Sequence, residues 1–194
     1  MPKERLAAFS DGVIAIIITI MVLEMKPPHH AGWESLAPVA PVFLSYVLSF
    51  LYLAIYWNNH HHLLMTVERV DGAMLWANMH LLFWLSLIPF ATGWMGENNF
   101  AAAPVALYGV ALLAPAIAYY ILQIAIIRRH GREGALARAI GADWKGKLSP
   151  ILYATGIAAS FATPQISLAL YVVVALIWLV PDRRIERALA ADRE

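Results

Sequence analysis

The stretch Arg5-Leu-Ala-Ala-Phe-Ser-Asp11-Gly-Val-Ile-Ala-Ile16-Ile-Ile-Thr-Ile-Met-Val-Leu23-Glu-Met25 decides the fold class of this chain. Its length and apolar character are those of a helix that crosses the ~30 Å hydrocarbon core of a bilayer. The carboxylate of Asp11 lies one to two turns inside the stretch, where it costs ~2.5–3.5 kcal/mol on insertion scales and normally has a partner. At about 100° per residue, Arg5 and Asp11 point to different sides of one helix. We therefore expect the partner of Asp11 on another helix.

Composition places the whole chain among polytopic membrane proteins. It is 61% hydrophobic and 14% charged, whereas soluble domains are about 25% charged. The apolar residues form long blocks, which is typical of several membrane spans. A net charge of +1 argues against a nucleic-acid partner. The absence of cysteine excludes disulfides, thiolate metal sites and cysteine nucleophiles. No small-residue cleavage site follows Leu23, so we predict a retained helix rather than a signal peptide.

The apolar blocks predict an all-α, polytopic membrane protein with six transmembrane helices in one domain, residues 1–194. The predicted spans are 5–25, 37–59, 73–95, 103–127, 149–162 and 165–181. A short surface helix is expected within 131–147, and Pro89 and Pro115 should kink the third and fourth spans. As one helix, 149–181 would be about 50 Å long, too long for the hydrocarbon core. We therefore predict a helical hairpin with its turn at Thr163-Pro164-Gln165.

Basic residues give the orientation of the six spans. With the amino terminus inside, every Lys and Arg except Lys26 falls on the cytoplasmic side. A five-span alternative would place Arg183, Arg184 and Arg187 outside. The positive-inside rule thus predicts that both termini are cytoplasmic.

The first span carries a periodic apolar face. Ile16, Ile20 and Leu23 are spaced i, i+4, i+7, which places them within about 60° of one another, whereas Asp11 lies about 140° from Ile16. One face could therefore look into a shared axis while the other is held by its own subunit. The alternative is that the three residues face lipid or the bundle core.

Polar residues in the second and third spans are candidate partners of Asp11. The second span ends in Trp57-Asn-Asn-His60-His61-His62, at a depth similar to that of Asp11, and imidazole donors there would satisfy the carboxylate. A zinc site is the alternative, although adjacent histidines diverge by about 100° on a helix and we predict no metal. Asn78 and His80 lie within the apolar third span, and they either join the Asp11 network or bind a neighbouring helix.

The string Arg5-Leu-Ala-Ala-Phe9-Ser10-Asp11 matches the R-x-x-x-F-S-D signature on the first helix of the endosomal/lysosomal potassium-channel family and its prokaryotic homologues. The six-span plan and the Trp57…His60-His61 element also resemble that family, so the resemblance covers essentially the whole chain. Animal members carry two such repeats per chain. This chain carries one repeat and so resembles the prokaryotic form, which assembles as a homotetramer. The resemblance therefore implies a location in the cell membrane, which we expect to be the plasma membrane of a prokaryote.

The resemblance implies roles for residues of the first span. First helices of four subunits would line a central pore, with Ile16 as its narrowest ring and Ile20 and Leu23 as further rings outward. Thr19 would occupy a position linked to cation selectivity. The expected packing network comprises Arg5, Phe9, Ser10 and Asp11, with His60 or His61 and Asn78 or His80 as partners.

The expected function is passive conduction of monovalent cations, with potassium in the pore and no cofactor. The chain has no T-V-G-Y-G-like string, so no fixed oxygen cage replaces the hydration shell and selectivity for potassium over sodium should be modest. Two alternatives are an intramembrane metal-dependent enzyme using His60, His61, His62 and Asp11, and a non-conducting assembly module in the membrane.

Overall fold

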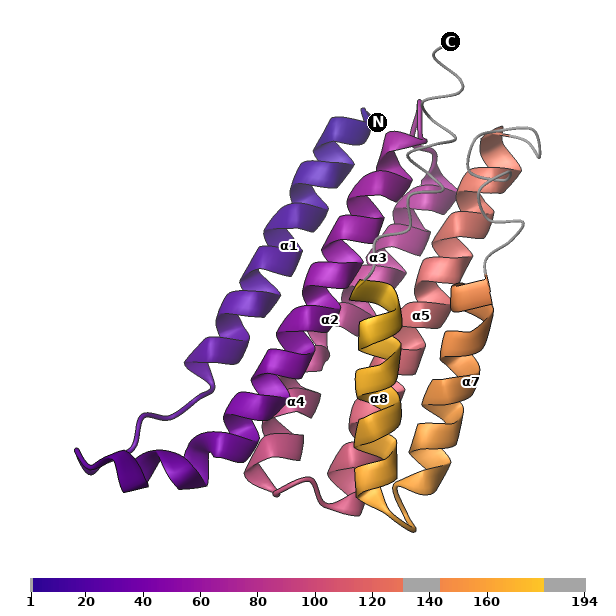
Figure 1. The fold of residues 1–194 in the computed structure, drawn as a ribbon. Coiled ribbons are helices and arrows are strands. Elements are labelled where there is room, and N and C mark those ends of the chain that lie inside the picture. The colour runs from indigo at the N-terminus through magenta and orange to yellow at the C-terminus, as the bar shows by residue number, and fades with distance from the viewer. Residues whose placement is uncertain (1, 131–143, 180–194) are drawn as a thin grey trace.

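The computed structural model describes residues 2–130 and 144–179, and these form a bundle of helices (Figure 1). The elements, in chain order, are α1 (Lys3–Leu23), η1 (Trp33–Val39), α2 (Ala40–Met65), α3 (Gly72–Ser86), α4 (Ile88–Glu97), α5 (Ala102–His130), α7 (Trp144–Ala159) and α8 (Pro164–Leu179). The described residues contain no strand. The prediction of an all-α fold is confirmed.

Among the residues that the structure describes, four helical stretches are long and apolar enough to cross a membrane: Lys3–Leu23, Trp33–Met65, Gly72–Glu97 and Ala102–Arg129. The chain is therefore a multi-pass membrane protein. The remaining helices, α7 and α8, have 16 residues each and pack against one another. α7 begins at Trp144, so Trp144-Lys-Gly-Lys147 belongs to this helix rather than to a surface segment, and 131–143 lies outside the described residues. The count of six spans and the cytoplasmic termini stay predictions.

The third predicted span consists of two helices. α3 ends at Ser86 and α4 begins at Ile88, directly before Pro89. Proline lacks the N–H that would continue the helical ladder, and its fixed φ suits the first turn of a new helix. Pro115, by contrast, lies inside α5, which continues to His130. Only the first of the two prolines thus interrupts a helix.

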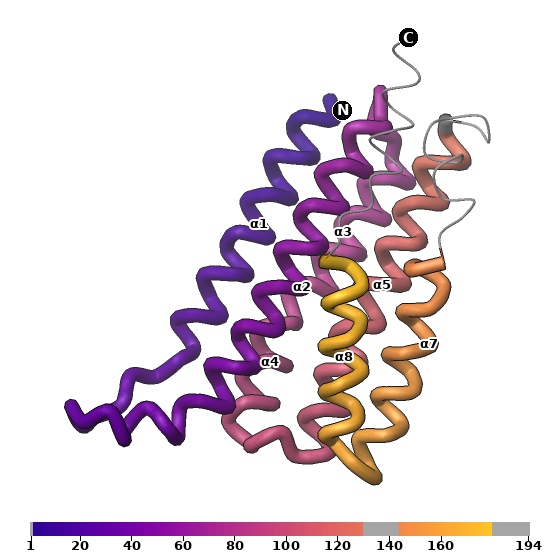
Figure 2. The backbone as a smooth tube through the Cα atoms, viewed as in Figure 1, coloured from indigo at the N-terminus to yellow at the C-terminus, as the bar shows by residue number. Residues whose placement is uncertain are grey.

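Two apolar cores divide the bundle. The first joins α1 and α3 to the C-terminal halves of α2 and α5 and contains Leu6, Ile14, Leu63, Leu81 and Leu122. The second joins α2, α4, α5, α7 and α8 around four tyrosines, Tyr52, Tyr108, Tyr153 and Tyr171. The two cores place α1 on one flank of the bundle, packed on α2, α3 and α4, and the α7–α8 pair on the other flank (Figure 2).

A buried hydroxyl cluster ties the middle of the bundle together. Ser49 on α2 contacts Thr92 on α4 at 2.7 Å and the Tyr108 hydroxyl on α5 at 2.9 Å. Thr92 also donates to the Ile88 carbonyl one turn back. Buried polar groups in a bilayer need partners, and here they satisfy one another across three helices. The register of α2, α4 and α5 is thereby fixed.

Helices α2 and α4 approach so closely that only glycine fits at one position. A Cβ added to Gly96 would lie 2.6 Å from the Val42 Cα, a backbone atom that has no rotamer to relieve the clash. A Cβ at Gly93, one turn earlier on the same helix, would meet nothing within 4 Å. We predict that Gly96→Ala destabilises the protein by about 1–3 kcal/mol, the usual cost of overpacking, and that Gly93→Ala does not. Thermal unfolding in detergent measures both, and equal melting temperatures for the two variants would contradict the packing described here.

Candidate functional site: the two faces of helix α1

The inner face of α1 is buried against its own subunit. Leu6, Ser10, Ile14, Ile17 and Met21 are all buried there. They recur with the three- and four-residue spacing of one helical face, and four of them contribute apolar surface to the first core. The burial of this face fixes the rotation of α1 about its own axis.

A polar chain crosses this apolar contact from α1 to α3 and α2. The Asn78 amide on α3 donates to Ser10 Oγ at 3.0 Å, and its carbonyl oxygen lies 2.7 Å from His60 Nε2 on α2. Ser10 in turn donates to the Leu6 carbonyl at 2.8 Å. All three side chains are 99–100% buried, since Ser10 and Asn78 are 0% and His60 is 1% exposed. The second imidazole nitrogen, His60 Nδ1, has no partner among the described residues.

The carboxylate of Asp11 has a different partner from the expected one. Its Oδ1 accepts a hydrogen bond of 2.9 Å from the indole N–H of Trp57 on α2. His61 stacks on the Trp57 ring, with 6.2 Å between ring centroids. The prediction of a histidine donor is therefore corrected, because the rotation of α2 directs His60 to Asn78 and Trp57 to Asp11. His80 lies outside this network, since it is exposed and accepts from Trp84 one turn along α3.

The R-x-x-x-F-S-D signature is split between the two faces. Ser10 and Asp11 form hydrogen bonds within their own subunit, with Asn78 and Trp57. Phe9 is 52% exposed and lies about 20° from Ile16 around the helix. Arg5 is exposed, and it makes no hydrogen bond or ion pair within residues 2–130 and 144–179. The expected network of four signature residues thus contains two of them in the single subunit.

The outer face of α1 is apolar and uncovered. Ile16, Ile20 and Leu23 are 59%, 40% and 79% exposed. Thr19 lies beside this stripe and is exposed, and its hydroxyl donates to the Ile16 carbonyl at 2.9 Å. Separate faces for Asp11 and the stripe are what the helical spacing predicts.

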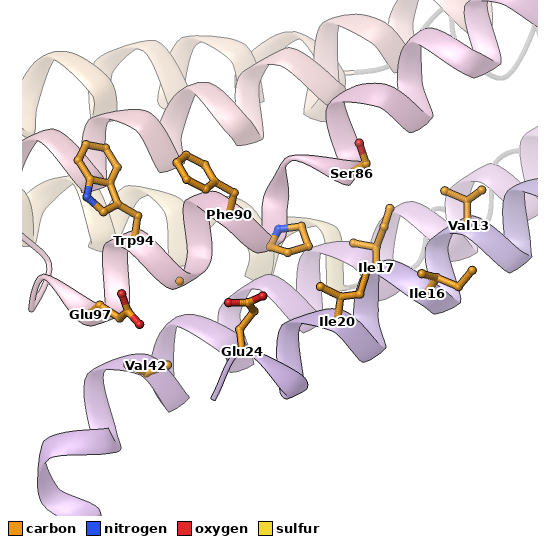
Figure 3. Close-up of a pocket in the computed structure, with 12 residues that line it drawn as sticks. Val13, Ile16, Ile17, Ile20, Glu24, Val42, Ser86, Phe90, Trp94 and Glu97 are labelled. Carbon is orange, nitrogen blue, oxygen red and sulfur yellow. The ribbon is translucent and has the colours of Figure 1, made fainter. Parts of the chain in front are cut away.

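A groove of about 540 Å³ runs beside this stripe between α1 and α4 (Figure 3). Ile16 and Ile20 form part of one wall, while Phe90 and Trp94 of α4 form part of the other. Two carboxylates, those of Glu24 and Glu97, lie at the end of the groove where α1 and α4 finish (Figure 3). Lys26 approaches Glu97 at 3.7 Å, but both side chains are largely exposed, so this ion pair adds little stability.

Three comparisons with known proteins agree on a family. The sequence profile of the endosomal/lysosomal potassium channel TMEM175 matches residues 5–89. A potassium channel of Chryseobacterium sp. (strain P1-3) is 57% identical over 189 residues, which cover 97% of this chain and 98% of that protein. The chain belongs to the TMEM175 family.

Further relatives support the same assignment. The crystal structure of a lysosomal potassium-selective channel TMEM175 homolog from Chamaesiphon minutus matches with a TM-score of 0.78 at 31% identity, covering 93% of this chain and 97% of that one. The endosomal/lysosomal proton channel TMEM175 of Homo sapiens is 30% identical over 116 residues, 54% of this chain but only 23% of that protein. The expected resemblance is thus confirmed.

Membership of the TMEM175 family places the chain among ion channels and not among enzymes. The side chains that the alternative of a metal-dependent enzyme requires have other partners, because His60 is hydrogen-bonded to Asn78 and Asp11 to Trp57. Within residues 2–130 and 144–179, no three His, Cys, Asp or Glu side chains gather as metal ligands would.

The Asp11–Trp57 bond predicts a thermodynamic coupling between α1 and α2. Trp57→Phe removes the indole N–H but keeps an aromatic ring, and Asp11→Ala removes the acceptor. Because both changes break the same bond, the double variant should lose less stability than the two single losses combined, by roughly 1 kcal/mol. Melting temperatures of the four proteins in one detergent measure this coupling. Strictly additive losses would show that the bond contributes nothing.

Asn78 is predicted to be the more critical polar side chain. Asn78→Leu leaves the His60 imidazole buried without its partner, at a cost of about 1–3 kcal/mol, and removes the link to Ser10. His80→Leu, two residues along the same helix, changes an exposed side chain and should be nearly neutral. The yield of folded protein on size exclusion and its melting temperature report the difference. Equal behaviour of the two variants would contradict the network.

Proposed function

We propose that this TMEM175-family chain is a potassium-permeable cation channel that assembles as a homotetramer, with α1 of each subunit facing a central pore. One observation carries the proposal: an apolar face of Ile16, Ile20 and Leu23 is exposed on the subunit, while the opposite face of the same helix is held by buried hydrogen bonds. The names of the bacterial relatives, potassium channels in Chryseobacterium and Chamaesiphon, supply the permeant ion.

Polar groups on the outer face favour a water-filled path over lipid. The Thr19 oxygen lies on the exposed side of a span, and polar side chains within spans usually face a cavity or the bundle interior. The carboxylates of Glu24 and Glu97 lie together at the end of the bundle where α1 and α4 finish. A negative mouth raises the local concentration of cations.

The proposed mechanism is conduction through a hydrophobic constriction. Four copies of Ile16 would form the narrowest ring, with Ile20 and Leu23 as wider rings toward the mouth. Such a ring gates by narrowing or by dewetting, since an ion that loses water there gains no fixed oxygen ligands in return. Selectivity for potassium over sodium would accordingly be modest, with the Thr19 hydroxyl as the nearest side-chain oxygen.

The proposed setting is the plasma membrane of a prokaryote, with six spans and both termini in the cytoplasm. Arg69 and Arg129 lie beside Pro2 at one end of the bundle, and Glu24 and Glu97 lie at the other, where α1 and α4 finish. Cytoplasmic loops carry the excess of Lys and Arg. This charge asymmetry supports an amino terminus on the cytoplasmic side.

Substitution of Ile16 tests the constriction. Ile16→Asn places an amide in the ring, which wets it and eases ion passage, so the potassium flux into proteoliposomes should rise or the potassium-to-sodium ratio should fall by several-fold. Ile151→Asn is the matched control, because Ile151 is 62% exposed on α7, on the flank opposite α1, and should leave both quantities unchanged.

Two results would contradict the proposal in different ways. If the unmodified protein gives no potassium flux in well-sealed vesicles, it is a non-conducting membrane module. If the flux is present but Ile16→Asn behaves like Ile151→Asn, the constriction lies on another surface.

A further inference from the structure

A second cavity lies on the side of the bundle away from α1, enclosed by α2, α5, α7 and α8. Its volume is about 530 Å³, within the usual range of small-molecule sites. The walls are rich in aromatic rings, with tyrosines from three helices and a tryptophan from α8: Tyr52, Tyr56, Tyr119, Tyr120, Tyr153 and Trp178. We call this space the tyrosine cavity.

The tyrosine cavity opens toward the surface between α5 and α7. Ile117 and Tyr120 on α5 are 48% and 58% exposed, and Lys147 on the facing turn of α7 is also exposed. The inner wall is buried, since Tyr52 and Tyr153 are 2% and 3% exposed. A molecule that enters sideways from the bilayer would therefore meet a rim with one cation and then an apolar, aromatic interior.

One polar side chain in the wall lacks a partner. Gln123 is 92% buried, at 8% exposure, and lines the cavity. Its amide makes no hydrogen bond with any of the described residues. Among the described residues, the fully enclosed side-chain atom without a partner is His60 Nδ1, so the Gln123 amide stays accessible from the cavity. A ligand atom in the cavity can therefore form a hydrogen bond with it.

The charge at the rim selects the kind of ligand. An aromatic-lined site can bind a quaternary ammonium by cation–π contacts. Here, however, Lys145 already lies over the Trp178 ring, 5.8 Å from its centroid, and Lys147 places a further cation at the rim of the cavity. A cationic headgroup would be repelled, whereas a phosphate would be attracted.

We propose that the tyrosine cavity binds one acyl chain of an anionic phospholipid, with its phosphate at Lys147 and its ester oxygens at Gln123. The position along the helices fits a lipid. Trp144, Lys145 and Lys147 open α7, and Trp and Lys are the residues that mark a membrane interface. Basic pockets between spans on the cytoplasmic side commonly bind anionic headgroups.

The lipid proposal is independent of conduction, and its test measures binding. The full-length protein is reconstituted in nanodiscs with either phosphatidylglycerol or phosphatidylcholine that carries a photoreactive diazirine in one acyl chain. After illumination, peptide mass spectrometry locates the crosslinks. Phosphatidylglycerol should label residues 116–123 and 146–153 preferentially, and competition by unlabelled phosphatidylglycerol should remove this labelling.

Two variants separate the headgroup contact from the chain contact. Lys147→Glu reverses the rim charge and should reduce labelling by phosphatidylglycerol at least about fivefold, without an effect on phosphatidylcholine. Ala116→Phe fills the cavity and should abolish labelling by both lipids there. Ala154→Phe, on the exposed side of α7, and Lys26→Ala, at the other end of the bundle, are the matched controls and should label normally.

Each variant is first compared with the unmodified protein by size exclusion and melting temperature, so that a misfolded variant is replaced by the milder Ala116→Leu or Lys147→Ala. Equal labelling by the two lipids in the unmodified protein would overturn the anionic headgroup. Labelling that Ala116→Phe and Ala116→Leu leave intact would overturn the cavity as the site.

Discussion

The hydrogen-bonded contact of α1 with α2 and α3 is the constraint on which the rest of the structure depends. Ser10, Asn78 and His60 form a buried polar chain inside an otherwise apolar interface. In a bilayer, a polar group without a hydrogen-bond partner raises the free energy of the folded protein. Only one rotation of α1 gives all three groups their partners. That rotation also sets the Asp11–Trp57 bond and leaves the Ile16–Leu23 stripe outward. The exposed apolar face and the buried polar network therefore both follow from the rotation of α1 about its own axis.

The family comparison fits this division of α1. The TMEM175 profile matches residues 5–89, and these contain every member of the buried network together with the exposed stripe. The α7–α8 pair lies beyond that range, on the other flank of the bundle, and carries much of the tyrosine cavity. We infer that the first three spans provide the conduction path, whereas the later helices provide a surface through which the bilayer can act on the subunit. The two parts are joined by Ser49, Thr92 and Tyr108 in the middle of the bundle.

Much of this arrangement follows from spacing along the chain. An apolar stripe and a carboxylate about 140° apart on one helix predict two functions for two faces, and a carboxylate inside a span predicts a partner on another helix. Which donor meets Asp11 does not follow, because it depends on the rotation of α2. The sequence favours the histidines that follow Trp57 as donors, although the indole N–H of Trp57 is a donor at the right depth. The tyrosine cavity was missed for a related reason: its residues extend from Tyr52 to Trp178, and only tertiary packing brings them together.

The central claim is that four copies of α1 converge through their exposed faces, and a disulfide tests it most directly. The chain has no cysteine, so Ile16→Cys introduces a single thiol. Disulfides form when the two Cα atoms approach to about 4.4–6.8 Å. Mild oxidation in native membranes should therefore give covalent dimers of Ile16→Cys in high yield, whereas Ile151→Cys, equally exposed on α7, should remain monomeric on non-reducing gels. Crosslinking of Ile151→Cys with none of Ile16→Cys would place the stripe in lipid and contradict the account.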